Sequence, residues 1–445
     1  MIDQRRTVYA LSILFAINLL NFFDRQILGA VTEPIRREWG LSDSAMGALG
    51  TAFTLLYAAA GVPLGRLTDR AKRTRILSAG VLAWSLLTAA SGLARNFWQL
   101  FGARLGVGVG EATCAPAATS LIGDLVPASR RGKALSFFML GLPVGLALSY
   151  GVSGTIAHAY GWRAAFYFAG VPGLLCSAAV LFIKEPPRGA VEARDVGRTR
   201  REGSPYLLVL SLPTMWWLIL SGVLHNFNMY ALSSFLTPLL MRFHHVDIRD
   251  SNFISMAIFG VAGTAGLLLG GSASDLMVER RANGRLLFGT VSLFGSIPLI
   301  LLALGRPSED VITFGALMLL ACTLMYTYYS TVYPAILDII EPSLRGTAMA
   351  IYFFGMYVLG ASMGPLGTGM VSDFFTKRAA RAAGIAELTQ HSLEPFRAQG
   401  LHWAMYLVPV LGALLTLVLF AGSRTVVKDS EKLQRWMREA SSADG

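Results

Sequence analysis

Charged side chains are scarce in this chain of 445 residues. Asp, Glu, Lys and Arg together make up 15% of it, whereas hydrophobic residues make up 54%. Soluble domains carry about 25% charged residues. The shortage of charge and the positive mean hydropathy of +0.53 exclude a large soluble core. They indicate a polytopic membrane protein.

Cysteine and catalytic motifs are also scarce. Cys114, Cys176 and Cys322 lie in apolar runs and show neither a disulfide framework nor the spacing of metal ligands. The chain contains no HExxH, GxSxG or P-loop motif. It also has no Ser, His and Asp placed within its apolar runs as a catalytic triad would be. The sequence therefore argues against an intramembrane enzyme and predicts no metal and no other cofactor.

The apolar residues form runs of about 20 residues or more, the length of a spanning helix. The first run follows Arg5 and Arg6 as in a signal peptide, but it is too long, contains charges and precedes further runs, so we expect it to be retained. We predict an all-α fold in which twelve helices span the membrane. Their expected ranges are 8–32, 43–68, 75–94, 97–122, 131–157, 163–184, 210–240, 251–274, 285–304, 310–338, 345–372 and 400–423.

The predicted helices divide into two bundles of six, because the widest internal polar stretch, about 185–206, lies between the sixth and the seventh. A second polar stretch, about 373–399, precedes the last helix. The predicted organisation is an N-terminal bundle (1–184), a cytoplasmic linker (185–209), a C-terminal bundle (210–424) and a cytoplasmic tail (425–445).

The formal net charge of +11 raises the question of nucleic-acid binding. Most Lys and Arg residues, however, fall in the loops on the same side as the N-terminus, which is the distribution of cytoplasmic loops. The charge thus reflects orientation in the membrane and not a nucleic-acid partner. We expect both termini to be cytoplasmic, in a bacterial-type inner membrane or a plasma membrane, and the protein to act as a monomer.

The two halves of the chain repeat weakly. Residues 65–69 (Gly-Arg-Leu-Thr-Asp) end the second predicted helix, and residues 271–275 (Gly-Ser-Ala-Ser-Asp) end the eighth. Asp124 and Asp338 each precede an Arg-Gly pair at the same spacing. Internal duplication of a six-helix unit is typical of secondary transporters, whose substrate sites lie between the repeats near the middle of the membrane.

The first predicted helix carries Asn21, Asp24 and Arg25 among apolar residues. A charge at the centre of a bilayer costs at least ~2.5–3.5 kcal/mol on insertion scales, so such groups usually face a protein interior or a water-filled cavity. Neighbours on a helix point about 100° apart, so Asp24 and Arg25 cannot share one partner surface. A substrate or ion site is favoured, and a buried ion pair that only fixes helix packing is the alternative.

The fourth predicted helix adds Arg104 and Glu111, which lie on one face two turns apart. The Gly-x-Gly-x-Gly string at 106–110 lies inside a span and follows no strand, so it does not indicate a dinucleotide site. Close helix packing is the better explanation for these glycines. Two guanidinium and two carboxylate groups are therefore expected inside the membrane in the N-terminal half.

The C-terminal half offers amide and aromatic groups in place of deep charges. We predict His225, Asn226, Tyr326 and Tyr352 at its cavity wall. A charged head against the first and fourth helices, with an apolar portion elsewhere, fits an amphipathic substrate. The alternatives are packing roles for the tyrosines and a structural hydrogen bond for the lone histidine, although histidine can titrate near neutral pH.

The loop after the second helix resembles a signature of the major facilitator superfamily, GxLaDrxGrr. It reads Gly-Arg-Leu-Thr-Asp-Arg-Ala-Lys-Arg over residues 65–73, and it departs from the signature at Lys72, where the family prefers glycine. The resemblance implies a gate that stabilises the outward-facing state. The residues assigned to the gate are Gly65, Asp69, Arg70, Arg73, Asp124 and Arg131.

Three strings together resemble the spinster branch of that superfamily: Asn-Phe-Phe-Asp-Arg at 21–25, Gly-Val-Gly-Val-Gly-Glu-Ala at 106–112 and Lys-Glu-Pro-Pro-Arg-Gly at 184–189. The first string also occurs in organic anion symporters. The resemblance implies transport of lysolipids or sphingosine-phosphate-like lipids, with the proton as the candidate driving ion. It also implies that Asp24, Arg25, Arg104 and Glu111 line the cavity.

A carboxylate that exchanges arginine partners between states changes its proton affinity. We therefore expect Glu111 or Asp24 to carry the proton, with Arg25 and secondarily Arg104 holding the anionic head, because arginine forks match phosphate or carboxylate. A proton-coupled symporter of small organic anions such as sugar acids is the second hypothesis. A sensor with a transporter-like fold is a third.

Overall fold

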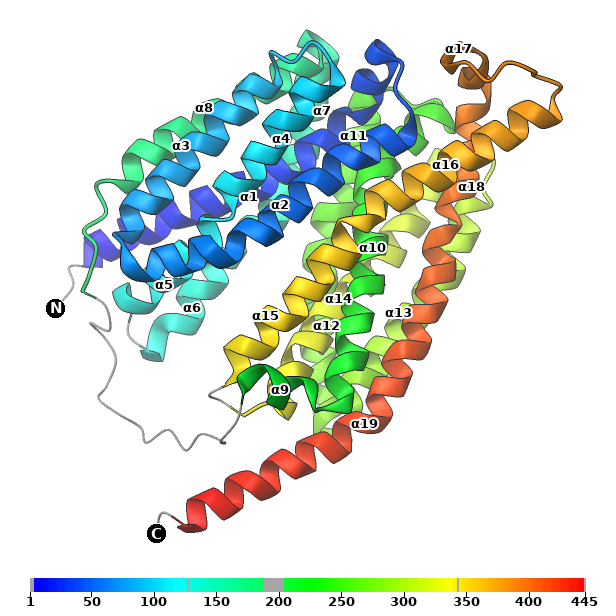
Figure 1. Cartoon of the computed structure of the whole chain (residues 1–445). Helices are drawn as coiled ribbons and strands as arrows, with labels where there is room; N and C mark the ends of the chain where they lie inside the picture. Colours follow the sequence, from blue (N-terminus) through cyan, green and yellow to red (C-terminus); the bar gives the residue numbers. More distant parts are fainter. Residues whose placement is uncertain (1–3, 127, 188–203, 342–343, 444–445) are drawn as a thin grey trace. The chain divides into compact units, whose positions relative to one another are not determined.

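The computed structural model describes residues 4–126, 128–187, 204–341 and 344–443, and these residues are almost entirely helical (Figure 1). Inside a bilayer the backbone must satisfy its own hydrogen bonds, which a helix does within one segment. Ten helical segments of the described chain are long and apolar enough to span a membrane. Two further helices of spanning length, α3 (Arg73–Ser91) and α10 (Pro213–Arg242), occupy the places of the third and seventh predicted spans. The predicted all-α polytopic fold is confirmed, and the count of twelve spans stays a prediction.

The chain divides into two compact units, and several helices pass from one to the other. Unit 1 contains residues 1–194, 233–260 and 365–404, and unit 2 contains residues 195–232, 261–364 and 405–445. The predicted bundles, 1–184 and 210–424, with their linker and tail, stay a prediction. Most of the linker, residues 188–203, lies outside the described residues.

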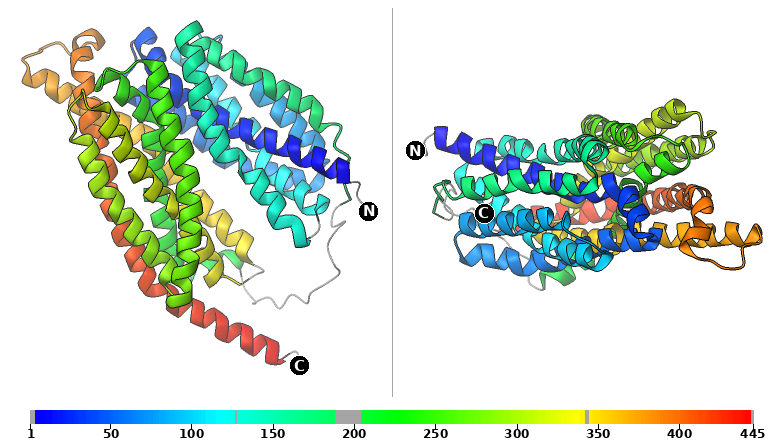
Figure 2. Two further views of the ribbon diagram at one scale, coloured as in Figure 1. Left: turned by 180° about the vertical axis from the view of Figure 1, so that it is seen from behind. Right: turned by 90° about the horizontal axis from the view of Figure 1, so that it is seen from above.

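Unit 1 is built on the helices of the N-terminal half. Within it α1 lies along α7, α3 lies along α8, and α2 packs on α4; these pairings can be followed in Figure 1 and from two further directions in Figure 2. The first eight helices are α1 (Gln4–Trp39), α2 (Asp43–Arg70), α3, α4 (Phe97–Glu111), α5 (Cys114–Leu125), α6 (Ala128–Met139), α7 (Gly141–Tyr160) and α8 (Trp162–Val180).

Later segments complete unit 1. They are the end of α10 from Ser233, α11 (Ile248–Met256), α16 (Met363–Ala382) from Pro365, α17 (Gln390–Leu393) and α18 (Arg397–Met405) up to Ala404.

Unit 2 contains the start of α10 and most of the remaining helices. In this unit α14 packs on both α12 and α13, and α13 also packs on α19. Its helices besides α10 are α9 (Pro205–Leu210), α12 (Ala262–Arg280), α13 (Gly284–Leu304), α14 (Val311–Ile339), α15 (Arg345–Gly355) and α19 (Leu407–Ala443).

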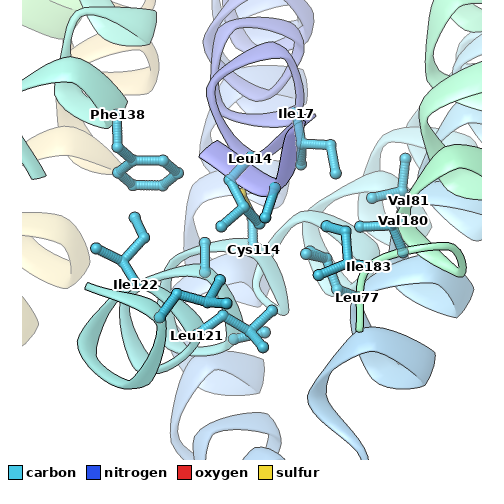
Figure 3. Packing of buried hydrophobic residues seen from close by; sticks show 14 of the residues in the cluster. Leu14, Ile17, Leu77, Val81, Cys114, Leu121, Ile122, Phe138, Val180 and Ile183 are labelled. Carbon is cyan, nitrogen blue, oxygen red and sulfur yellow. The ribbon is translucent and has the colours of Figure 1, made fainter. Parts of the chain in front are cut away.

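The core of unit 1 is an apolar cluster shared by many of its helices. Figure 3 shows Leu14 and Ile17 of α1 near Cys114 of α5, with Leu77 and Val180 on neighbouring helices. Each of these side chains is at most 2% exposed. This cluster fixes the start of α5, and therefore the neighbouring end of α4 that carries the site described below.

The structure differs from the predicted spans in three ways. The fourth and fifth predicted spans are each two helices, α4 with α5 and α6 with α7, because the chain turns at 112–113 and at Leu140. The first helix extends to Trp39, past charged residues that ion pairs satisfy. The polar stretch 373–399 is not a simple loop, because α16 continues through it to Ala382 and α17 follows.

Candidate substrate and coupling site

Arg25 of α1 and Glu111 at the end of α4 form a buried ion pair in unit 1. The Arg25 Nε donates to Glu111 Oε2 over 3.1 Å, and the two side chains are 4% and 0% exposed. The second carboxylate oxygen of Glu111 has no hydrogen bond among the described residues. A charge this deep in apolar surroundings needs its partner, because an uncompensated buried charge is strongly destabilising.

Asp24 faces a different neighbour from Arg25, as the helical turn requires. Its Oδ2 accepts a hydrogen bond of 2.8 Å from the Thr88 hydroxyl of α3, and its backbone carbonyl accepts one of 3.1 Å from Arg104 Nη2. Its other carboxylate oxygen has no hydrogen bond among the described residues. Asp24 and Arg104 are 3% and 1% exposed. The four ionisable residues predicted from the sequence therefore lie close together on α1 and α4.

Aromatic rings surround the two guanidinium groups. The Arg25 guanidinium carbon lies 4.1 Å from the ring centre of Tyr57 and 5.0 Å from that of Phe22. That of Arg104 lies 5.3 Å from the ring centre of Phe53. Cations over ring faces are attracted by the ring quadrupole, more strongly where water is excluded. The rings thus help to hold both arginines inside the span.

The glycines of α4 let its neighbours approach closely. A Cβ at Gly108 would lie 2.7 Å from the Phe53 carbonyl oxygen of α2, and one at Gly110 would lie 2.8 Å from Trp84 Cβ of α3. Small residues at such contacts are typical of membrane helix packing. This agrees with the packing role that the sequence indicated for the glycine string, and it brings Glu111 next to α1.

Two asparagines of α1, Asn18 and Asn21, have different roles. Asn18 donates to the backbone carbonyl of Phe138 over 2.8 Å and so ties α1 to α6. Asn21 is 3% exposed, and its Nδ2 has no hydrogen-bond partner among the described residues. Asn21 therefore has a donor available next to the charged residues, whereas Asn18 serves packing.

In unit 2 the predicted residues of α10 lie against the tyrosines of α14. The His225 ring stacks on Tyr328 with centroids 4.0 Å apart, and neither ring nitrogen has a hydrogen bond among the described residues. Asn226 donates to the Gly222 carbonyl and accepts from the Tyr329 hydroxyl over 3.1 Å. The surroundings of these two side chains are aromatic, and their place at a cavity wall stays a prediction.

Tyr352 and Tyr326 differ in their surroundings. The Tyr352 hydroxyl lies 3.0 Å from that of Tyr328, which lies 2.7 Å from the Ser221 hydroxyl. This chain of three hydroxyl groups joins α15 to α14 and α10. Tyr326 packs instead against α12, where a Cβ at Gly266 would lie 2.7 Å from Tyr326 Cβ. The structure thus places Tyr352 in a hydrogen-bond network and Tyr326 in a close helix contact.

Arg73 is the centre of the predicted gate loop. It is 1% exposed, and it pairs with Asp124 at the end of α5 and with Glu185 after α8, the latter over 3.0 Å. The backbone nitrogen of Arg73 and the hydroxyl of Thr74 also donate to the Glu185 carboxylate. Burial, the largest influence, raises the pKa of Glu185, but these hydrogen bonds outweigh it and the pKa lies below its ordinary value.

The other gate residues are less engaged. Gly65 accepts from the Thr68 hydroxyl through its carbonyl, and Arg70 is exposed at the end of α2. The side chains of Asp69 and Arg131 lie outside the described residues. In unit 2, Arg285 near the start of α13 pairs with Asp275 over 3.0 Å and with Asp338 over 3.5 Å. Asp275 and Asp338 are the residues that echo Asp69 and Asp124, so the sequence repeat has a counterpart in the ion pairs.

Sequence reasoning missed two sets of charged residues. Glu185 belongs to the string 184–189, which indicated only a resemblance to a family. No nearby residue in the sequence indicates that Glu185 pairs with Arg73. The second set is a buried cluster where α1 ends and α2 begins, centred on Glu33 and Asp43. The pair Glu33 and Arg36, one helical turn apart just after the predicted end of the first span, was the available signal. Among the described residues no group of three or more His, Cys, Asp and Glu is placed to hold a metal ion.

Comparison with known proteins identifies the family. Residues 14–365 match the Major Facilitator Superfamily. Protein spinster homolog 3 of Danio rerio is 31% identical over 397 residues, which cover 84% of this chain and 79% of that protein. Protein spinster homolog 1 of Xenopus laevis is 30% identical over 393 residues, covering 84% and 75%.

A solved structure agrees with these relatives. The crystal structure of a bacterial homolog of the human lysosomal transporter spinster, inward-facing and unoccupied, matches with a TM-score of 0.84 and 28% identity. The match covers 96% of this chain and 99% of that one. The chain therefore belongs to the Major Facilitator Superfamily and is a spinster-like multi-pass membrane transporter.

Proposed function

We propose that the protein is a secondary active transporter of an anionic amphipathic substrate, a lysolipid or a sphingosine-phosphate-like lipid, coupled to protons and working by alternating access. The observation that carries the proposal is the Arg25–Glu111 ion pair with Asp24 and Arg104 beside it. Ionisable residues inside spans are costly and usually belong to substrate or proton pathways. The similarity to spinster homologs supports a transporter.

The two arginines are the proposed site for the anionic head. Arg104 has two guanidinium nitrogens, Nε and Nη1, without a hydrogen bond among the described residues. Arginine presents a fixed fork of donors that matches phosphate or carboxylate oxygens. An anion that binds Arg25 competes directly with Glu111 for the same guanidinium, and Asn21 offers a further donor from one turn earlier on α1.

We assign to residues of unit 2 the binding of the apolar portion of the substrate and of its uncharged glycerol or sphingoid hydroxyl groups. His225, Asn226, Tyr326 and Tyr352 offer ring faces, an amide and hydroxyl groups but no formal charge. Such a surface accepts an acyl chain and hydroxyl groups and does not compete for the anionic head.

Proton coupling is proposed to use Glu111 or Asp24. When the carboxyl group of Glu111 takes a proton it no longer holds the charge of Arg25, which is then available to the substrate head. When the head leaves, Arg25 again stabilises the ionised carboxylate and the proton is released. A cycle of this kind links one proton-binding event to one substrate-binding event without a covalent step.

The remaining parts of the proposal follow from the family and the charge distribution. Residues 1–184 and 210–424 are proposed to move as two bundles around the site, with the loop at 65–73 as part of a gate. Both termini are proposed to face the cytoplasm, and the protein is proposed to act as a monomer in the membrane. Neither catalysis nor a cofactor is needed for this activity.

Reconstituted uptake tests the proposal. Proteoliposomes with and without an inward proton gradient would be offered sphingosine phosphate, lysophospholipids and sugar acids in parallel. Uptake of the lipids that rises with the gradient is the expected result. Gradient-driven uptake of sugar acids alone would favour the organic-anion hypothesis, and no uptake of any compound, with no counterflow, would contradict a carrier.

A further inference from the structure

The last helix of unit 2, α19, continues well beyond the length that a bilayer needs. It has 37 residues, whereas about 20 residues span the hydrocarbon core. The first charged residue after its start at Leu407 is Arg424. The helix therefore leaves the hydrocarbon near Arg424, and its last turns, the red end of the chain in Figure 1, lie outside it. We call residues 424–435 the tail helix.

One exposed face runs along the whole of α19 and changes its chemistry at the edge of the hydrocarbon. In the apolar part this face carries Val410, Leu414 and Leu417, which are all exposed. At about 100° per residue, positions 424, 428, 432 and 435 continue the same face. These positions hold Arg424, Lys428, Lys432 and Arg435, all of them exposed, which we call the basic face. A face that suits lipid tails thus becomes basic at the level of the headgroups.

The acidic residues of the tail helix leave most of this positive charge uncompensated. Asp429 is buried and faces inward, where its Oδ2 accepts from the backbone nitrogen of Thr214 at the start of α10 over 3.0 Å. Glu431 lies beside the basic face and pairs with Arg435 over 3.6 Å, with both side chains more than half exposed. An exposed pair one turn apart contributes little. Four basic residues and one acidic residue leave this surface with a net charge of three.

Another side of the tail helix fastens it to unit 2. Val426 and Leu433 are buried, and Leu433 lines a pocket together with residues of α9 and of the end of α14. The Thr214 hydroxyl donates to that of Thr425 over 2.7 Å, next to the hydrogen bond that Asp429 accepts. The basic face is therefore held in one orientation. A surface that is already in place loses less conformational freedom when a ligand binds.

Aromatic side chains mark the headgroup level on the same end of unit 2. Tyr206 of α9 and Trp216 of α10 are exposed, and the Trp216 ring nitrogen donates to the Leu210 carbonyl over 2.8 Å. The guanidinium carbon of Arg424 lies 4.8 Å from the ring centre of Phe420. Tyr and Trp gather at membrane–water interfaces, and a long basic side chain there covers apolar surface while its charge stays in the polar layer. The tail helix thus begins where headgroups are expected.

We propose that the basic face of the tail helix is a docking surface for anionic phospholipid headgroups of the leaflet in which α19 ends. Clusters of Lys and Arg directly beyond a spanning helix attract anionic lipids, and arginine forks match phosphate oxygens. Other segments of the chain complement the surface less well: residues 188–203 carry five basic and three acidic side chains, and a second copy would present the same sign of charge. The inference goes beyond the proposed transport, because it depends on neither the cargo nor the charged residues of α1 and α4.

A fluorescent reporter on the tail helix tests the docking surface. Full-length protein with Gln434→Cys, at an exposed position, would be labelled and placed in phosphatidylcholine nanodiscs, with protein lacking the added cysteine as the background. A small fraction of either phosphatidylglycerol or phosphatidylcholine would carry the same nitroxide quencher. The reporter responds to lipid near the tail helix, so lipid bound at the proposed transport site does not register. Stronger quenching by phosphatidylglycerol, with a preference that weakens as salt is added, is the expected result.

Two double variants with the same change of charge make the outcome decisive. K428Q/K432Q removes two members of the basic face, and K377Q/R378Q removes two exposed basic residues of α16. The association of phosphatidylglycerol relative to phosphatidylcholine is expected to fall about fivefold for each lysine lost in the first variant and to stay unchanged in the second.

Melting temperatures in detergent check that both variants fold, and the comparison of the two lipids in the wild type requires neither variant. Equal quenching by the two lipids in the wild type overturns the docking surface. A lipid preference that K428Q/K432Q leaves unchanged overturns it as well, and so does a fall of the same size in both variants, which would show a general effect of charge.

Discussion

Arg25 and Glu111 meet between α1 and α4, with 3.1 Å between Nε and Oε2 and with both side chains almost completely buried. A one-turn shift of either helix would break this contact, since successive turns are about 5.4 Å apart. The pair therefore serves as a sensitive indicator of how α1 is placed relative to α4. The pair can also be broken chemically. A proton bound to Glu111 can take the place of Arg25, and an anion bound to Arg25 can take the place of Glu111.

Glu111→Gln is expected to abolish proton-driven accumulation while leaving substrate exchange. Glutamine keeps the shape and one hydrogen bond to Arg25 but binds no proton, so the gradient can no longer act. The measurement is uptake in proteoliposomes with an imposed pH gradient, compared with counterflow at equal pH. Asp24→Asn serves as the matched variant. The variant whose uptake no longer rises with the proton gradient identifies the residue that carries the proton. Wild-type coupling in both variants would contradict the assignment of either residue.

The parts of the fold that the sequence predicted are those governed by local composition. Apolar runs located the helices, because a helix satisfies its own backbone hydrogen bonds in a bilayer, although α1, α16 and α19 continue well past the predicted ends. The breaks at 112–113 and Leu140 were missed because both lie inside continuous apolar runs. The C-terminal end of α1 was missed because Glu33 and Arg36 are charged, and charged residues usually mark the end of a membrane span. Only the folded structure places Arg242 of α10 beside Glu33 and so neutralises its charge.

The candidate site shows the same division. Spacing along one helix was enough to place Arg104 and Glu111 on one face, and neighbour geometry was enough to separate Asp24 from Arg25. Ion pairs between residues that are far apart in the sequence could not be predicted from the spacing along a single helix. Arg73 and Glu185 are more than a hundred residues apart in the chain, so only the packing of α3 on α8 brings them together.

Gly108→Ala is expected to destabilise the protein, whereas Gly102→Ala is expected to stabilise it slightly. The added methyl group at Gly108 meets the backbone carbonyl of Phe53, and overpacking of this kind costs typically ~1–3 kcal/mol. At Gly102 nothing lies within 4 Å, and alanine in a helix gains roughly 0.5–1 kcal/mol over glycine. Melting temperatures in detergent compare the two. Equal stability would show that α2 and α4 do not approach as described.

Glu185→Gln is expected to lower stability at neutral pH but not at acidic pH. The pKa of Glu185 is lowered in the folded protein, so its contribution is fully present above the unfolded pKa, about 4.3, and is lost as the pH falls through the lower pKa of the folded protein. The expected loss is about 1 kcal/mol, because the carboxylate accepts charge-assisted hydrogen bonds but is partly solvated. Melting curves at pH 7 and at about pH 3, well below the unfolded pKa, would show the gap closing. Glu279→Gln, at an exposed position, is the control and should show no gap at either pH.

His225→Phe is expected to keep or raise the melting temperature and to leave the pH dependence of uptake unchanged. Phenylalanine retains the stacking of His225 on Tyr328, and it removes two buried ring nitrogens that have no hydrogen bond among the described residues. Burying a polar group without a partner costs free energy, so its removal is favourable if the ring serves only packing. Because coupling is assigned to α1 and α4, uptake should still rise with the proton gradient, and any loss should appear in the apparent affinity for the lipid. A His225→Phe variant that folds normally but no longer responds to the gradient would place the proton carrier on α10 instead of on Glu111 or Asp24.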